Sequence, residues 1–164
     1  MNEYPAFNAK EFLNLVHDAS TGGRCFITHQ QVRFGHIDPA GIAYFPRIFN
    51  YIHEAFEDLW GNFIGLPYNR LVNDRRVGFP LVHADVDFKR GLHFGERPTV
   101  KVSCFKLGRA SLGLRYRYEV GLNLCLEARM VTACIDLDSV ASFPIPAEYR
   151  RAFVTIAEPT VSGP

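Results

Sequence analysis

The chain has 164 residues, 48% of them hydrophobic and 21% charged, and a formal net charge of +1. This length allows one domain with a buried core, and so small a net charge argues against nucleic acid or a membrane surface as a partner. No apolar run is long enough to cross a bilayer, and the N-terminus lacks the basic start and apolar segment of a secretory signal. We therefore expect a cytoplasmic protein whose four cysteines are buried free thiols.

The N-terminal part of the chain is expected to be an added arm. Residues 1–24 form this arm, in which residues 11–18 have the spacing of a short helix that glycines end. Residues 25–34 alternate loosely and predict a first strand. The main domain is expected to span residues 25–155, followed by a frayed tail over residues 156–164.

The stretch from residue 33 to residue 60 organises the rest of the sequence. Asp38-Pro39-Ala40-Gly41 predicts a tight loop, because Pro39 fixes its own φ and Gly41 can adopt a conformation closed to other residues. A second proline follows where a helix would begin, and the first turn of a helix does not need its backbone N–H. Apolar residues then recur at helical spacing, at Ile48, Ile52, Ala55, Phe56 and Leu59. A helix this apolar is expected to be covered by a sheet.

The second half of the sequence predicts strands. Residues 61–78 contain glycine, proline and asparagine and predict an irregular connection. Period-2 alternation then predicts four strands, over residues 81–88, 99–107, 112–120 and 124–137. Two prolines end the last strand, and a closing helical turn is expected just after them. One strand, one long helix and four consecutive antiparallel strands indicate an α+β fold, a curved sheet of about five strands around the helix.

The residues around the loop are similar to those of a known family. F-G-H-I-D-P-A-G-I-A-Y-F-P-R-I-F-N-Y resembles the signature of the 4-hydroxybenzoyl-CoA thioesterase family of hotdog-fold enzymes. The resemblance covers roughly residues 25–153. It implies the hotdog fold, in which a curved antiparallel sheet wraps a central helix. It also implies hydrolysis of an acyl-CoA to coenzyme A and a carboxylic acid, without a metal or redox cofactor.

The resemblance also implies roles for single residues. Asp38 matches the family's catalytic carboxylate, the backbone N–H of Phe45 matches the amide that polarises the thioester carbonyl, and Gly41 belongs to the same loop. Residues 78–82 resemble the edge that the partner subunit contributes in the family's dimer. The expected substrate-binding residues are His36, Tyr44, Pro80 and Val82. The expected residues for the phosphates of coenzyme A are Arg109, Lys106 and Ser111.

The residues themselves leave two roles open for Asp38. Aspartate in D-P-x-G is common turn chemistry, because its side chain accepts hydrogen bonds from nearby backbone. Here, however, the loop opens onto a helix N-terminus, which supplies oriented N–H groups and a partial positive charge. A thioester carbonyl would be polarised there as in an oxyanion hole, and a carboxylate beside it could attack the carbonyl or activate water. Glu54 and Glu57 are the reserve candidates, because other hotdog thioesterases carry their catalytic glutamate on this helix.

Two further patterns contain metal-ligating residue types. The run from His53 to Glu57 lacks the second histidine of the zinc protease motif and is expected to be a polar stripe on the helix. His83-x-Asp85-x-Asp87 puts its side chains on one face of a strand, where a solvent-facing or interface surface is favoured over a metal site. No metal site is therefore expected.

The sequence specifies the acyl group of the substrate and the oligomeric state less closely than the fold. Aromatic residues around the helix suit a benzoyl or hydroxybenzoyl group, although a short or medium aliphatic group fits the sequence as well. The alternatives are a thioesterase acting on acyl carrier protein, a hotdog dehydratase using His36 or His53, and a non-catalytic acyl-CoA-binding protein. Because a curved sheet leaves an edge strand unpaired, we expect a homo-oligomer, at least a dimer and more specifically a dimer of dimers.

Overall fold

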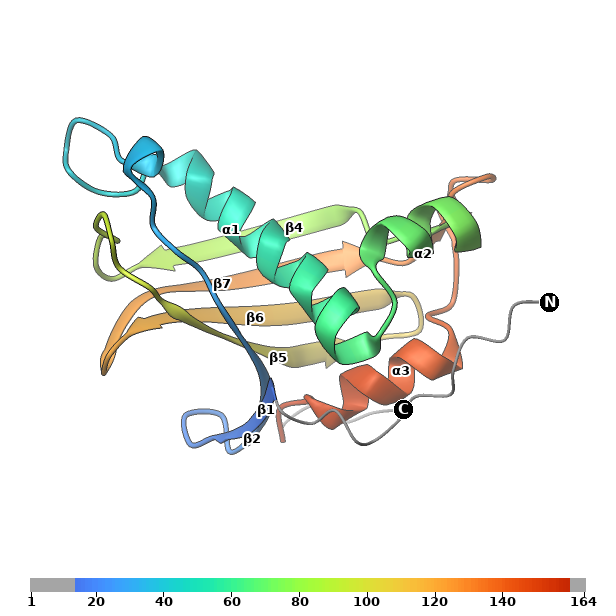
Figure 1. Cartoon of the computed structure of the whole chain (residues 1–164). Helices are drawn as coiled ribbons and strands as arrows, with labels where there is room; N and C mark the ends of the chain where they lie inside the picture. The colour runs from blue at the N-terminus through green and yellow to red at the C-terminus, as the bar shows by residue number, and fades with distance from the viewer. Residues whose placement is uncertain (1–13, 160–164) are drawn as a thin grey trace.

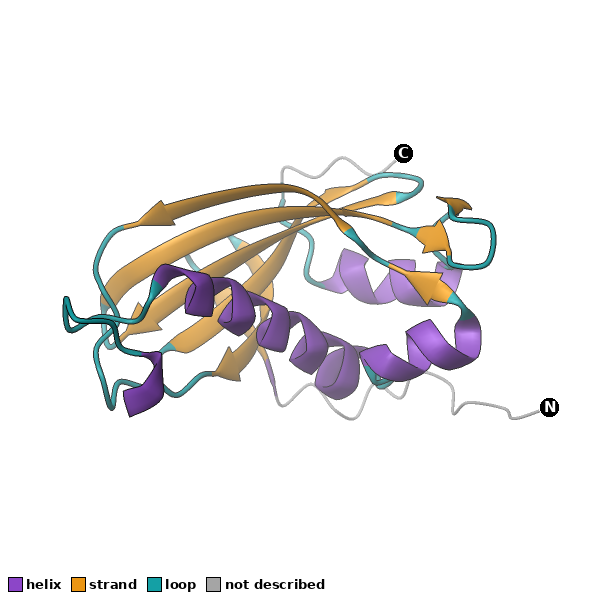
Figure 2. Ribbon diagram, turned by 90° about the horizontal axis from the view of Figure 1, so that it is seen from above, coloured by secondary structure: helices purple, strands orange, loops and turns teal. Residues whose placement is uncertain are grey.

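The computed structural model describes residues 14–159 and has the predicted α+β arrangement. One long helix, α1 (Phe45–Asp58), lies across the concave face of a curved antiparallel sheet (Figure 1). Figure 2 shows the curvature of the sheet around this helix, with two shorter helices together near one end.

The main sheet has six strands, so it is one strand wider than the predicted count of about five. Its order is β1-β2-β5-β6-β7-β4, and every neighbouring pair is antiparallel. The strands are β1 (Leu15–Asp18), β2 (Gly23–His29), β4 (Leu81–Phe88), β5 (Thr99–Leu107), β6 (Ser111–Val120) and β7 (Asn123–Ala133). A small second sheet contains β3 (Val77–Gly78), β8 (Ile135–Asp136) and β9 (Ala141–Ser142). β4 is therefore a free edge of the main sheet, next to α1.

The apolar face of α1 packs on the sheet as the sequence predicts. Its buried residues are Ile48, Tyr51, Ile52, Ala55 and Phe56. The helix continues without a break into a π-helical turn, Leu59–Ile64. Gly65 ends it with a φ of 81°, a left-handed conformation that glycine adopts without a steric penalty.

Three local predictions are wrong. Leu15–Asp18 is a strand paired with β2, where a short helix was expected over residues 11–18; residues 11–13 lie outside the described part. The connection predicted to be irregular contains α2 (Tyr68–Arg75), which starts directly after a proline and buries Leu71 completely. The predicted last strand is divided, because β7 ends at Ala133 and β8 begins two residues later in the other sheet. In each case packing on a distant segment outweighs local propensity.

A cluster of aromatic rings joins the helices at one end of the sheet. Trp60 is fully buried, and its ring centroid lies 5.1–6.2 Å from five other rings. These rings belong to Phe56, Tyr68, Phe79, Tyr149 and Phe153. The cluster fixes the end of α1 against α2 and against α3 (Ala147–Thr155).

Residues 156–159, the described part of the tail that the sequence predicted to be frayed, pack on β5; residues 160–164 lie outside the described part. Cys104 N–H donates to Ile156 O and Glu158 N–H donates to Cys104 O, both at 2.8 Å. The Glu158 side chain is buried, accepts hydrogen bonds from Ser103 Oγ and Arg115 Nε at 2.8 Å, and forms an ion pair with that arginine. The outer limits of the predicted arm, domain and tail stay a prediction.

We expect Glu158→Gln to lower the free energy of unfolding by about 1–3 kcal/mol. The substitution keeps the size of the side chain but leaves a half-buried guanidinium, Arg115, without one of its two carboxylate partners. Urea unfolding followed by circular dichroism would measure the loss. Asp138→Asn is the control, because it removes a carboxylate from an exposed ion pair with Arg76 and should change stability far less. Equal losses in both variants would contradict a stabilising role of the buried pair.

Candidate active site

The Asp38 loop is a closed turn held by backbone hydrogen bonds. Asp38 N–H donates to Ile42 O at 3.0 Å, and Gly41 N–H donates to Asp38 O at 2.9 Å. Gly41 has a φ of 80°, which explains why the loop needs glycine at this position. The sequence prediction of a tight loop that precedes a helix is thus confirmed.

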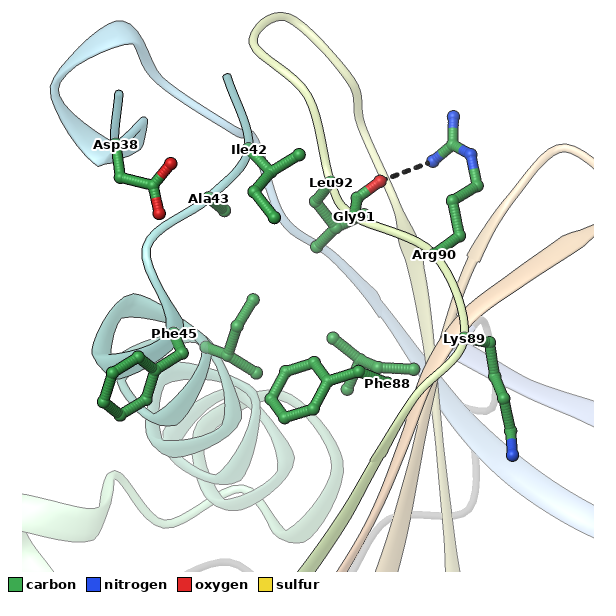
Figure 3. A pocket seen from close by; sticks show the side chains of 11 residues that line it. Asp38, Ile42, Ala43, Phe45, Phe88, Lys89, Arg90, Gly91 and Leu92 are labelled. Carbon is green, nitrogen blue, oxygen red and sulfur yellow. Dashed lines mark hydrogen bonds between the residues drawn. The ribbon is translucent and has the colours of Figure 1, made fainter. Parts of the chain in front are cut away.

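The two oxygens of the Asp38 carboxylate have different surroundings. Oδ1 accepts a hydrogen bond from the Ala40 N–H at 2.8 Å, which is the turn role that the sequence left open. The other oxygen has no hydrogen-bond partner within residues 14–159, and Asp38 lines a pocket of about 420 Å³. Figure 3 shows the side chain projecting from the loop into the space above the start of α1. One oxygen therefore holds the turn, and the other is available to a ligand.

Phe45, the first residue of α1, lines the same pocket. The helix begins at Phe45, its preceding residue Tyr44 provides no side-chain cap, and Pro46 in the first turn has no N–H to offer. Within the described part of the chain, no acceptor pairs with the Phe45 N–H. The structure thus brings together a carboxylate oxygen and an unpaired helix-terminal amide, as the family resemblance implied.

The opposite wall of the pocket is built from the end of β4 and the residues after it. Phe88 lies across from Phe45, and Gly91 lies against the Asp38 loop (Figure 3). A Cβ atom at Gly91 would lie 2.5 Å from Ile42 Cγ2, so only glycine permits this close approach. Arg90 fixes the segment through Gly91 O and an ion pair with Glu96. The wall is mainly apolar, which suits an acyl or pantetheine chain better than a charged group.

Two other residues predicted to bind substrate lie near this pocket but outside its wall. His36 Nδ1 lies 2.6 Å from the hydroxyl of the buried Tyr51 and 3.3 Å from the Arg33 N–H. This imidazole therefore joins the loop to the middle of α1. Tyr44 is half exposed, and its ring lies 5.3 Å from the Phe45 ring.

The remaining predicted site residues lie at the other end of the sheet. Pro80 and Val82 flank the start of β4, whereas the pocket is at its end. The predicted phosphate-binding residues Lys106, Arg109 and Ser111 lie around the turn between β5 and β6. In Figure 1 this turn is beside α2 and α3, at the end of the sheet away from the Asp38 loop. Since β6 has ten residues at about 3.3 Å each, the two ends are separated by roughly 30 Å. One chain does not bring the two groups together.

A second arginine, which the sequence analysis missed, contacts the turn between β5 and β6. Arg150 on α3 donates hydrogen bonds to Gly108 O and Arg109 O. The Arg109 side chain is exposed and, within residues 14–159, makes no ion pair. Arg150 thus lies against the backbone of the turn that carries Arg109. No local pattern around residue 150 could have indicated this, because the contact joins segments about 40 positions apart.

The alternative catalytic and metal residues are arranged differently. His53 Nε2 lies 3.0 Å from Glu57 Oε1 on the exposed side of α1, and Glu54 is exposed beside them. His83, Asp85 and Asp87 are exposed on β4. Among residues 14–159 no three His, Cys, Asp or Glu side chains are grouped as metal ligands would be. Within the same range no helix is long and apolar enough to span a membrane.

Comparison with known proteins decides the family. Residues 32–153, which include the loop, α1 and the strands from β4 to β7, match the family model described as the thioesterase-like superfamily. The chain belongs to this superfamily. The predicted family and enzyme class, a hotdog-fold acyl-CoA thioesterase, are thereby confirmed.

The relatives are thioesterases of similar length. A 1,4-dihydroxy-2-naphthoyl-CoA hydrolase of Nostoc punctiforme is 31% identical over 124 residues, which cover 75% of this chain and 82% of the relative. A solved 1,4-dihydroxy-2-naphthoyl-CoA thioesterase from Synechocystis is 26% identical with a TM-score of 0.72, covering 79% of this chain and 96% of the other. A solved gentisyl-coenzyme A thioesterase is 28% identical with a TM-score of 0.70, covering 77% and 98%. These structures share the hotdog arrangement described above.

Proposed function

We propose that the enzyme hydrolyses an aromatic acyl-CoA to coenzyme A and an aromatic carboxylic acid, at the pocket between Asp38 and Phe45. The observation that carries the proposal is that one pocket is lined both by Asp38, which has a carboxylate oxygen without a partner, and by Phe45, whose N–H has no acceptor within residues 14–159. The thioester carbonyl oxygen would accept the Phe45 N–H, where the partial positive charge of the helix end stabilises the oxyanion of the transition state. The relatives named above act on aromatic acyl groups, which supports the choice of acyl class.

Asp38 has two chemically distinct routes to the products. As a nucleophile, its free oxygen attacks the carbonyl carbon, expels the coenzyme A thiolate and forms a mixed anhydride that water then hydrolyses. As a general base, it removes a proton from a water molecule that attacks the same carbon. Both routes require a charged carboxylate, which contacts the carbonyl carbon in the first and the attacking water in the second. Gly41 gives the loop the conformation that holds this carboxylate in place.

The active enzyme is proposed to be a homodimer in which each site takes residues from both chains. Seven of the eight residues of β4 are exposed, and its Leu81, Val82 and Phe88 are large apolar side chains in contact with solvent. An edge strand of this kind readily pairs with another strand. When two copies of β4 pair antiparallel about a two-fold axis, the Leu81 end of one lies beside the Phe88 end of the other. The Asp38 pocket of one chain then lies beside Pro80, Val82 and the β5–β6 turn of its partner.

This dimer gives a role to the turn between β5 and β6, around which the basic residues Lys106 and Arg109 lie. Arg109, supported by Lys106, Ser111 and Arg150, would bind the phosphates of a coenzyme A whose thioester lies at the partner's Asp38. Guanidinium groups bind phosphate by paired hydrogen bonds, and the tight turn at Gly108 keeps the backbone close to Ser111. Two such dimers would form the proposed tetramer. Cytoplasmic localisation remains a proposal from the sequence.

We expect Arg109→Ala to raise KM for CoA esters about 10-fold while kcat changes little. The phosphate contact is the same in the ground and transition states, so its loss weakens binding uniformly. The KM difference should shrink at high salt, because this exposed interaction is screened. Arg24→Ala, which removes an exposed arginine from β2 on the far side of the sheet, is the control and should leave KM unchanged. An unchanged KM in Arg109→Ala would remove this residue from the coenzyme A site.

The proposed reaction is tested with a panel of thioesters and a thiol-detecting dye. Benzoyl-, hydroxybenzoyl-, dihydroxynaphthoyl-, short-chain and long-chain acyl-CoA would each be assayed for release of coenzyme A, alongside the same acyl groups on acyl carrier protein. Aromatic CoA esters should have the highest kcat/KM. Faster release from the carrier protein would instead make a protein the substrate, and no release from any thioester would refute the proposed reaction.

A further inference from the structure

A second pocket lies along α1, at the opposite end of β4 from Asp38. Its volume is about 260 Å³, and none of its residues is shared with the Asp38 pocket. Its wall is mainly aromatic and includes Phe49, Phe56, Tyr68, Phe79 and Tyr116. Rings on several sides of a cavity of this size suit a flat apolar group.

One polar group in this wall has no partner. Tyr116, from β6, is only 2% exposed, and within residues 14–159 its hydroxyl makes no hydrogen bond. Burial raises its pKa far above the usual value, so the hydroxyl stays a neutral donor. Because Tyr116 lines the pocket, a ligand that supplies an acceptor there would form a hydrogen bond with this hydroxyl.

Each of the other two hydroxyls of this pocket makes one hydrogen bond within the chain. Tyr68 Oη accepts a hydrogen bond from the Phe79 N–H at 3.1 Å. Thr132 Oγ1 donates to Leu112 O at 3.3 Å. The Tyr68 O–H can still donate, whereas the Tyr116 hydroxyl makes no hydrogen bond within residues 14–159 and has both functions available to a ligand.

A histidine stands at the mouth of the same pocket. His53 lies beside the rings of Phe56 and Tyr68, with centroid distances of 6.3 and 6.4 Å, and its Nε2 faces Glu57. If Nε2 carries the proton that Glu57 accepts, Nδ1 of the neutral ring is an acceptor. The pocket thus combines a buried donor, aromatic walls and a half-exposed imidazole, which together fit a ring that carries hydroxyl groups.

The position of the pocket connects it to catalysis in the partner chain. It contains Leu81 at the start of β4, and in the paired dimer this end lies beside the partner's Asp38 pocket. An acyl group whose thioester carbon is held at one chain's Asp38 would extend into the second pocket of the other chain. We infer, on the basis of the shared-site thioesterase proposed above, that this second pocket holds the acyl group and that Tyr116 selects aromatic acyl groups bearing a ring hydroxyl.

The test compares substrates that differ only in ring hydroxyls. In the wild type, kcat/KM should be higher for 4-hydroxybenzoyl-CoA than for benzoyl-CoA, and for 1,4-dihydroxy-2-naphthoyl-CoA than for 2-naphthoyl-CoA. In the substrate pair that the wild type hydrolyses faster, Tyr116→Phe should lower kcat/KM about 10-fold for the hydroxylated substrate. It should leave kcat/KM nearly unchanged for the substrate without ring hydroxyls. Phenylalanine keeps the ring in the core, so the fold should be retained, as thermal unfolding would verify.

Tyr118→Phe is a matched control on the same strand. Tyr118 faces the same side of β6 two residues later, is fully buried and also has an unpaired hydroxyl, but it lines neither pocket. Tyr118→Phe should leave kcat/KM unchanged for both substrates. If Tyr116→Phe affects hydroxylated and unsubstituted substrates equally, or neither of them, selection by this hydroxyl is refuted.

A binding measurement separates failure of this inference from failure of the proposed reaction. Calorimetric titration with 4-hydroxybenzoate and with benzoate needs no catalysis. Suppose that the wild type hydrolyses no thioester. If Tyr116→Phe then weakens the binding of 4-hydroxybenzoate but not of benzoate, the result would still support the pocket assignment. If the two acids bind equally in the wild type and in the variant, the assignment is overturned whatever the activity.

Discussion

Asp38→Asn should lower kcat about 10²–10⁴-fold while KM stays within a few-fold of the wild type. Asparagine keeps the shape and an acceptor oxygen for the Ala40 N–H, so the loop should keep its conformation. It removes the negative charge of the oxygen that faces the pocket, and with it the capacity to attack or to accept a proton. The contribution of that charge is greatest in the transition state, which is why kcat rather than KM should change. Steady-state kinetics on an aromatic CoA ester, with circular dichroism as a fold check, would measure it.

The helix glutamates supply the control for this experiment. Glu54 and Glu57 are exposed on α1, and the latter is paired with His53. Glu54→Gln and Glu57→Gln should each cost far less than Asp38→Asn. If Asp38→Asn stays folded and nearly fully active while a glutamate variant is inactive, the catalytic carboxylate lies on α1. The chain would then use the chemistry of a different hotdog subfamily.

The loop and the central helix were predictable because their signals are local. In D-P-A-G, one proline and one glycine restrict φ at two positions, and the structure has Gly41 at 80° as expected. The wide apolar face of α1 likewise follows from spacing alone. Four of its five buried residues are ones that the periodicity indicates, and the exception is Tyr51. The polarity of the helix then puts the Phe45 amide beside the loop without any information from the rest of the chain.

The elements that were missed depend on distant partners. Leu15–Asp18 is a strand because β2 offers it an unpaired edge, and four residues carry too little pattern to show this. The asparagines in α2 suggested a loop, yet the fully buried Leu71 makes the segment a helix through packing. The strand predicted to run through residue 137 divides because its last residues pair with β3 and β9.

Half of the candidate site could not be assembled from one chain at all. The sequence named both Asp38 and Arg109, but the structure separates them by the length of the sheet. The alternation over residues 112–120 predicts which face of the strand Tyr116 takes, but it carries no information on whether the Tyr116 hydroxyl finds a partner. We propose that the missing information is a second subunit, which would bind along the exposed edge strand β4.

Breaking the β4 pairing should therefore remove most of the activity. Light scattering should find the wild type as a dimer or a tetramer at micromolar concentration. Ala84 lies near the centre of β4 and is exposed, so a single chain tolerates a larger side chain there. In an antiparallel pair about a two-fold axis, Ala84→Glu would put two like charges close together at the axis, which disfavours pairing. The variant should be a folded monomer, and kcat/KM should fall about 100-fold or more because each site loses its partner's residues.

Leu122→Glu is the matched control for this variant. It adds the same charge at a fully exposed position in the turn between β6 and β7, away from the β4 edge. It should leave both the oligomeric state and kcat/KM unchanged. A stable wild-type monomer, or an Ala84→Glu monomer with full activity, would show that one chain contains a complete site. An Ala84→Glu protein that remains a fully active dimer would place the subunit interface elsewhere than β4. Each of these outcomes would rule out a site shared across the β4 edge, in which Arg109 of one chain binds a substrate held at Asp38 of the other.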